Sequence, residues 1–155
     1  MEREMQHIQQ LMMENKQLLM PLFRYLPWLE SSMGKQVSTN YQGDGIAEHS
    51  ISFPVYDGTL MNFIREASKS PLMDRNYHYV YTRNRIKTHE DERRIIAKAT
   101  WKDWDILRGI LSKYVLGGRT KGTLWNEAVK EQIFYLVIHR MKEIIEYWDK
   151  PMDCR

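Results

Sequence analysis

The 155-residue sequence contains a single cysteine, Cys154, and no apolar run of 18 residues. One cysteine cannot form a disulfide framework within the chain, so a disulfide-stabilised secreted fold is excluded and a reducing compartment, by default the cytoplasm, is expected. Because the sequence has no long apolar run, we expect no membrane-spanning helix and no signal peptide. Internal repeats and low-complexity tracts are also missing, which favours a single domain over residues 1–155.

Motifs for catalysis and metal binding are also missing. No Gly-x-Ser-x-Gly element occurs, and the one cysteine cannot complete a zinc site. We therefore predict no metal, no cofactor and no catalytic residue, and regard an enzyme as the less favoured class. The histidines, none of which has His-x-x-x-His or His-Glu-x-x-His spacing, are His7, His49, His78, His89 and His139.

What the sequence does contain is a strong helical pattern in its last third. Thr100 and Asp103 have the spacing of a capping box, and an amphipathic helix is expected to follow them. A glycine-containing loop, 117–122, then separates it from a second apolar pattern. This second pattern predicts one continuous central helix over about 123–148, with apolar positions at Trp125, Val129, Ile133, Val137, Met141, Ile145 and Trp148.

Alternating residues around a turn signal at 43–45 predict a β-hairpin over about 35–56. A helix is expected after Asp57, and the polar residues 87–92 are interpreted as a loop. The expected fold class is therefore α+β, mostly α, with a helical domain arranged around the long C-terminal helix.

The N-terminal segment has a heptad pattern with one polar core position. Residues 1–19 could thus form a helical extension that pairs with a second copy or a partner helix. The alternative is a helix folded onto its own domain. Pro21 is expected to break or kink this helix near Met20. The predicted dimer seam consists of Met5, Ile8, Met12, Asn15 and Leu19.

Positive charge is concentrated between residues 75 and 121, a segment that contains twelve lysines and arginines and five acidic residues. This distribution predicts either a basic face for an acidic partner or an ordinary solvated surface. The loop before the predicted long helix combines glycines with cations, as anion-binding loops do, although a simple helix-to-helix turn is the alternative. The candidate anion- or partner-binding residues are Arg83, Arg85, Gly118, Arg119 and Lys121.

The segment 75–85 combines tyrosines with arginines, as nucleic-acid surfaces do. In a helix, however, Tyr77, Val80 and Tyr81 would share one side and belong to the core. That arrangement would leave Tyr79 and the arginines outside.

Several of these residues also resemble a known group of proteins. The segments 53–57, 72–77, 110–115 and 124–129, with Phe134, are similar to an uncharacterised bacterial domain family of hypothetical proteins. The resemblance covers about residues 20–146 and implies a bacterial or phage-borne cytoplasmic protein without an assigned activity. The helix before Met20 and the basic loop 119–122 depart from the family pattern.

Three functions are compatible with these observations. The first is a non-enzymatic module that binds a macromolecular partner, most simply a protein, and that in a phage or mobile element would block a host factor. The second is a nucleic-acid-binding protein that uses the basic region 75–121. The third is a small enzyme with an unrecognised site around Asp57, Asp74 and His139.

Overall fold

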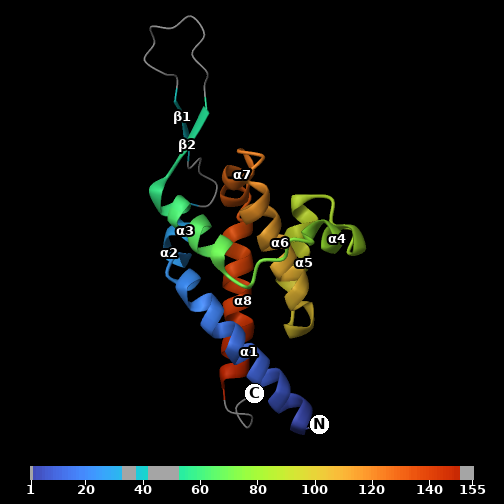
Figure 1. Ribbon diagram of the computed structural model, residues 1–155. Helices are drawn as coiled ribbons and strands as arrows, with labels where there is room; N and C mark the ends of the chain where they lie inside the picture. The colour runs from blue at the N-terminus through green and yellow to red at the C-terminus, as the bar shows by residue number, and fades with distance from the viewer. Residues whose placement is uncertain (1, 33–37, 42–52, 151–155) are drawn as a thin grey trace, which may run out of the picture.

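The computed structural model describes residues 2–32, 38–41 and 53–150. Within these ranges, no helix has both the length and the apolar character needed to cross a bilayer. The elements, shown in Figure 1, are α1 (Glu2–Phe23), α2 (Leu26–Ser31), β1 (Ser38–Tyr41), β2 (Phe53–Tyr56), α3 (Gly58–Lys69), α4 (Tyr77–Arg83), α5 (His89–Lys98), the 3₁₀ turn η1 (Trp101–Asp103), α6 (Trp104–Gly117), α7 (Leu124–Lys130) and α8 (Ile133–Asp149).

The packed domain is all-α, so the predicted α+β class is wrong. Every hydrophobic side chain described as buried lies on a helix or on a connection between helices. The hairpin expected over about 35–56 is not a layer of this domain. Its described part is limited to β1 and β2, which pair antiparallel and project beyond α3 in Figure 1, while 35–37 and 42–52 lie outside the described residues. A ribbon of two four-residue strands is too small to supply a packed sheet face.

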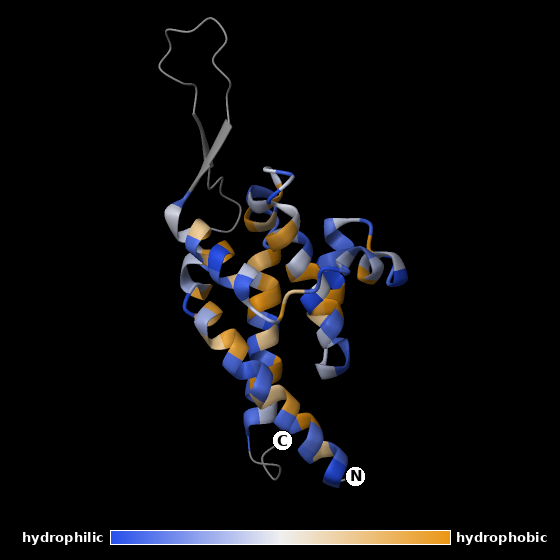
Figure 2. Ribbon diagram, viewed as in Figure 1, coloured by the Kyte–Doolittle hydropathy of each residue, from blue (hydrophilic) through white to orange (hydrophobic). Residues whose placement is uncertain are grey.

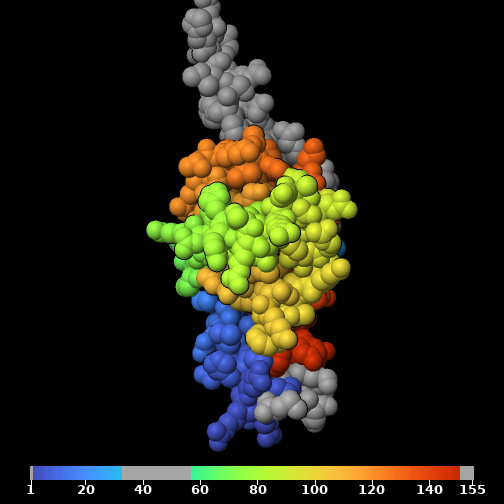
Figure 3. Space-filling view, turned by 90° about the vertical axis from the view of Figure 1, so that its right-hand side faces the viewer, coloured from blue at the N-terminus to red at the C-terminus, as the bar shows by residue number. Residues whose placement is uncertain are grey.

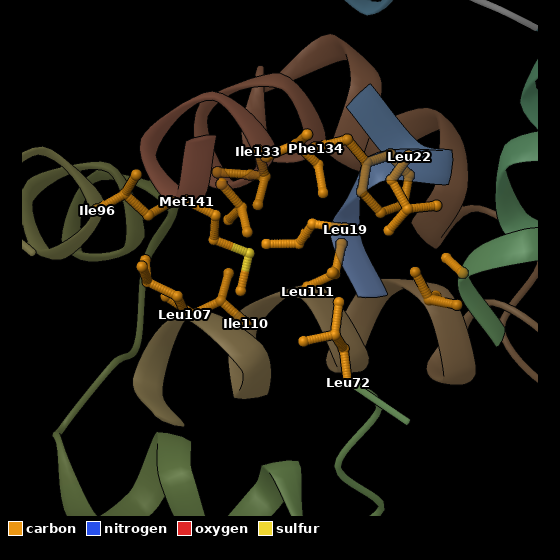
Figure 4. Close-up of a cluster of buried hydrophobic side chains, with 14 of the residues drawn as sticks. Leu19, Leu22, Leu72, Ile96, Leu107, Ile110, Leu111, Ile133, Phe134 and Met141 are labelled. Atoms are coloured by element: carbon orange, nitrogen blue, oxygen red, sulfur yellow. The ribbon is translucent and has the colours of Figure 1, made fainter. Parts of the chain in front are cut away.

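Helix α8 occupies the centre of the domain. It packs against α1, α2, α5, α6 and α7, and Figure 2 shows that its sequence is largely hydrophobic. Ile133, Val137 and Met141 are fully buried, as the helical pattern predicted. Figure 4 shows Met141 and Phe134 facing leucines and isoleucines from α1 and α6. Contact on several sides explains why the apolar surface of this helix is so wide.

The predicted continuous helix over 123–148 is wrong, because the chain divides it into α7 and α8. Gln132 separates them in the left-handed conformation, with φ 71° and ψ 10°. On α5, the Arg93 guanidinium donates hydrogen bonds to both the carbonyl and the carboxylate of Glu131, each at 3.1 Å. A tertiary contact therefore satisfies a backbone group at the end of α7, where neither glycine nor proline marks a break.

Helix α1 is not broken near Met20, which was one of the two predicted effects of Pro21. It continues through Pro21 to Phe23, close enough to its C-terminus for the proline to be accommodated in the final turns. The buried residues Ile8, Met12, Leu19 and Leu22 form the side of α1 that packs within the domain.

Two capping boxes set the starts of helical segments. The predicted one is confirmed: Thr100 Oγ1 accepts from Lys102 N, and Asp103 Oδ2 accepts from Thr100 N. A second one joins Thr88 and Asp91 and opens α5, so the interpretation of 87–92 as a loop is wrong. Both follow the Thr-x-x-Asp spacing, in which the two side chains satisfy amides that a helix leaves unpaired.

The left-handed Gln132 gives a test of the break between α7 and α8. Replacing Gln132 with glycine should raise the free energy of unfolding by about 0.5–1 kcal/mol, because glycine adopts positive φ without a Cβ penalty. Gln10→Gly on the exposed side of α1 is the matched control and should lower it by about 1 kcal/mol. Urea unfolding measures both. Equal destabilisation by the two substitutions would contradict the left-handed break.

Candidate functional site

A hollow of about 510 Å³ lies between the end of α3, the connection to α4 and the end of α6. Three cations border it, Lys69, Arg75 and Arg119, and they come from three separate segments of the chain. No carboxylate contributes to its lining. We call this hollow the basic groove; its lining is Ser68, Lys69, Ser70, Pro71, Met73, Arg75, Tyr77, Leu116 and Arg119.

The three cations of the basic groove are not neutralised by other described residues. Several basic residues elsewhere do form ion pairs, for example Arg93 with Glu131 and Arg94 with Asp91, both at 3.1 Å. No ion pair or hydrogen bond joins the side chain of Lys69, Arg75 or Arg119 to another residue of the described ranges. None of the three cations is therefore held in an ion pair within the described residues.

The connection that carries Arg75 is fixed to α6 at two points. The Asp74 amide donates to Ser112 Oγ at 2.8 Å, and Ser112 is fully buried. Arg108 Nε donates to the Leu72 carbonyl at 2.9 Å. These contacts hold one wall of the basic groove in place.

The predicted anion-binding loop has a different geometry from the one expected. Gly118 is not left-handed, since its φ is −66°. The amides of Arg119 and Thr120 donate to the carbonyls of Leu116 and Gly117, so they do not face a ligand. Gly118 is needed for another reason: a Cβ there would overlap the indole of Trp125.

The predicted binding residues lie in different parts of the structure. Arg119 joins the basic groove, whereas Gly118 is buried beneath Trp125. Lys121 is exposed in the same turn as Arg119. Arg83 and Arg85 are exposed at the far end of α4, whose other end borders the groove through Tyr77. Lys69 was missed, and Arg75 was predicted only as part of the basic segment 75–85, because only the fold brings both residues to the same hollow as Arg119.

Helix α4 is held against the domain by only part of its surface, and none of its residues is fully buried. Val80 lies directly against Gly109 of α6, where a Cβ would come within 2.7 Å of a Val80 methyl group. Tyr81 reaches inward to Glu92 of α5. On the other side, Tyr79 keeps 65% of its surface exposed. Figure 3 shows α4 on the outside of the molecule.

Glu92 is the centre of a buried polar network that sequence reasoning missed. Its side chain is almost completely buried, yet it accepts hydrogen bonds from the hydroxyls of Tyr81 and Tyr114, the latter at 2.8 and 2.9 Å. His89 Nδ1 lies 2.8 Å from Glu92 and its Nε2 lies 2.6 Å from Glu127. A signal existed in the spacing of Glu92 four residues before the buried Ile96, on one side of a helix.

The network keeps its tyrosines protonated. Burial, and then the negative charge of Glu92, raise the pKa of both Tyr81 and Tyr114 well above the ordinary value of 10.0. The Lys113 ammonium lies 4.6 Å and 4.9 Å from the centres of the two rings and 3.9 Å from Glu92. The Glu92 carboxylate thus receives donors from α4 and α6, which ties α4 to the domain.

The predicted dimer seam contacts its own domain in this structure. Ile8, Met12 and Leu19 are buried, and Met5 is partly buried against the same core. Asn15 Nδ2 donates to the Leu11 carbonyl of its own helix at 2.9 Å. The contacts support the alternative interpretation, in which the N-terminal helix folds onto the domain.

The residues of the enzyme hypothesis are not brought together. Asp57 caps α3 by accepting from the Thr59 amide, and Asp74 accepts from the Asn76 amide. His139 lies on α8, where it pairs with Glu143 at 3.3 Å. The described ranges also contain no group of three histidine, cysteine or acidic residues arranged to hold a metal ion.

Comparison with protein-family models, curated proteins and solved structures finds no match for this chain. The resemblance of residues 20–146 to an uncharacterised bacterial family therefore stays a prediction.

The packing of Trp125 over Gly118 can be tested by adding one methyl group. Gly118→Ala should lower the free energy of unfolding by about 1–3 kcal/mol, because the new Cβ would displace the indole. Gly58→Ala, where a Cβ meets open space, is the control and should cost nothing. Chemical denaturation compares the two, and a harmless Gly118→Ala would show that the indole lies elsewhere.

The Glu92 network predicts a specific dependence of stability on pH. Tyr114→Phe should cost about 1–3 kcal/mol at pH 7, because a buried carboxylate loses a donor. The folded-state pKa of Tyr114 is raised, so its stabilisation is fully present below pH 10 and declines above it. The difference between the two proteins should then shrink by about 1.4 kcal/mol per pH unit above 10.

Urea unfolding at pH 7 and pH 11 measures this difference. Tyr147→Phe, at a half-exposed tyrosine on α8, is the control and should behave like the unaltered protein. A cost of Tyr114→Phe that stays constant up to pH 11 would mean that the hydroxyl is not a buried donor.

Proposed function

We propose that this protein is a non-enzymatic interaction module that binds an acidic macromolecular partner through the basic groove. One observation carries the proposal: Lys69, Arg75 and Arg119 converge from three segments on a hollow that no carboxylate lines, and no described residue neutralises them. Such an arrangement places positive charge on several sides of one hollow, which favours binding of an anion there.

The groove has chemistry suited to recognition. Arginine guanidinium groups bind carboxylates and phosphates with paired hydrogen bonds, and Arg75 and Arg119 are both available for this. The exposed Lys121 and, along α4, Arg83 and Arg85 extend the positive surface beyond the groove. A partner would be attracted from a distance by this field and oriented by the groove.

Pre-organisation also supports binding. The connection carrying Arg75 is held by Ser112 and Arg108, and α4 is held by the hydrogen bond of Tyr81 to Glu92. A surface fixed before the partner arrives loses less conformational entropy on binding. The groove lining offers cations and hydroxyls and no carboxylate or imidazole that could act as a general base, which favours binding over catalysis.

The proposal predicts retention on a polyanion and a position-specific loss of it. The unaltered protein should bind heparin-agarose at low salt, and the triple charge reversal K69E/R75E/R119E should elute at a markedly lower salt concentration. The control R3E/K98E/K130E changes three exposed cations elsewhere and carries the same net charge.

Elution of the two triple variants at the same salt would show that net charge, and not the basic groove, governs binding. Failure of the unaltered protein to bind at all would refute the proposal. Circular dichroism and thermal unfolding of each variant would exclude a loss of folding as the cause.

A further inference from the structure

We infer that the acidic partner is a single-stranded nucleic acid, whose phosphates enter the basic groove and whose bases stack on the outer side of α4. This inference rests on the proposed function and specifies its partner. It depends on three features of α4 and its flanks: the absence of acidic residues, an exposed aromatic ring and the positions of the cations.

The first feature is the charge of the segment 75–89. It contains Arg75, Arg83, Arg85 and Lys87 and no aspartate or glutamate. All four cations are exposed, and none of their side chains has a hydrogen-bonding or ion-pairing partner among the described residues. Such a segment, which is bounded by Asp74 and Glu90, offers four positive charges to a polyanion.

The second feature is Tyr79, which is 65% exposed on the outer side of α4. The inner side of the helix is occupied by Val80 against Gly109 and by Tyr81 bonded to Glu92. Most of the surface of Tyr79 is thus left in contact with solvent. An exposed tyrosine with arginines before and after it in the chain is a combination with which proteins stack unpaired bases while holding their phosphates.

The third feature is spacing. Tyr79 and Arg83 are four residues apart and share one side of the helix, and Arg75 lies four residues before Tyr79 at the groove. Arg75 lies in the turn before α4, and the helical rise from Tyr79 to Arg83 is about 6 Å. A strand that crosses α4 could thus contact the groove, the tyrosine ring and Arg83 in succession.

A single strand suits this surface better than a duplex or an acidic protein. Stacking on Tyr79 requires a base that is not already paired and stacked within a duplex. Helix α4 has seven residues and lies against α6, so it does not project like a recognition helix. An acidic protein would pair with the cations, whereas a single strand supplies an unpaired base that can stack on the ring together with each phosphate.

Fluorescence anisotropy with a labelled 15-nucleotide oligothymidylate tests the inference. The unaltered protein should bind this strand more tightly than a duplex of the same length and more tightly than polyglutamate. Tyr79→Ala should weaken binding to the strand about 5- to 100-fold, the range expected for loss of one stacked base, whereas Tyr79→Phe should retain it. Tyr147→Ala, at another exposed tyrosine on α8, is the matched control and should bind normally.

The outcomes separate the inference from the proposed function. If Tyr79→Ala binds the oligonucleotide normally while K69E/R75E/R119E does not, or if polyglutamate binds as tightly as the strand, the partner is a polyanion of another class. The inference then fails and the proposed function stands. If neither the oligonucleotide, heparin nor polyglutamate binds the unaltered protein, both fail.

Discussion

The structure depends on covering the apolar surface of α8 on several sides. Helices α1, α2, α5, α6 and α7 all contact it, so elements from both ends of the chain are required before this surface is removed from water. Burial of that area is the main favourable contribution to folding. The same requirement explains why the N-terminal helix, despite its heptad pattern, packs within the domain: Ile8, Met12 and Leu19 help to enclose the core.

A buried carboxylate connects this core to the surface proposed to bind a partner. Glu92 accepts hydroxyl donors from Tyr81 on α4 and Tyr114 on α6, and removing one partner of such a buried group costs far more than an exposed contact. Because α4 has no fully buried residue of its own, this network and the Val80–Gly109 contact determine its position. The positions of Arg75, Tyr79 and Arg83 therefore depend on the hydrogen bonds and packing contacts that α4 makes with the interior of the domain.

The fold determines which cations bind other residues of the domain and which remain exposed without a partner in the described ranges. Two cations of the basic region make contacts within the domain: Arg93 holds the end of α7, and Arg108 holds the connection before α4. Outside that region, Arg140 donates to the Ala99 carbonyl at 3.0 and 2.8 Å. Among the described residues, some of the cations that remain unpaired border the groove or lie on and after α4, and others, such as Lys98 and Lys130, lie elsewhere on the surface. A count of charges along the chain could not distinguish these two groups, because pairing depends on neighbours distant in sequence.

The sequence by itself determined the amphipathic helices, the Thr100 capping box and the burial of Ile133, Val137 and Met141, because these follow from local periodicity and local hydrogen bonds. Tertiary structure alone decided the all-α class, the left-handed break at Gln132 and the meeting of Lys69, Arg75 and Arg119. Residues 129–133 contain neither glycine nor proline, and Lys69 lies fifty residues before Arg119, so neither feature had a local signal. Both arise from contacts between distant segments, whose energies exceed the local preferences that a sequence pattern records.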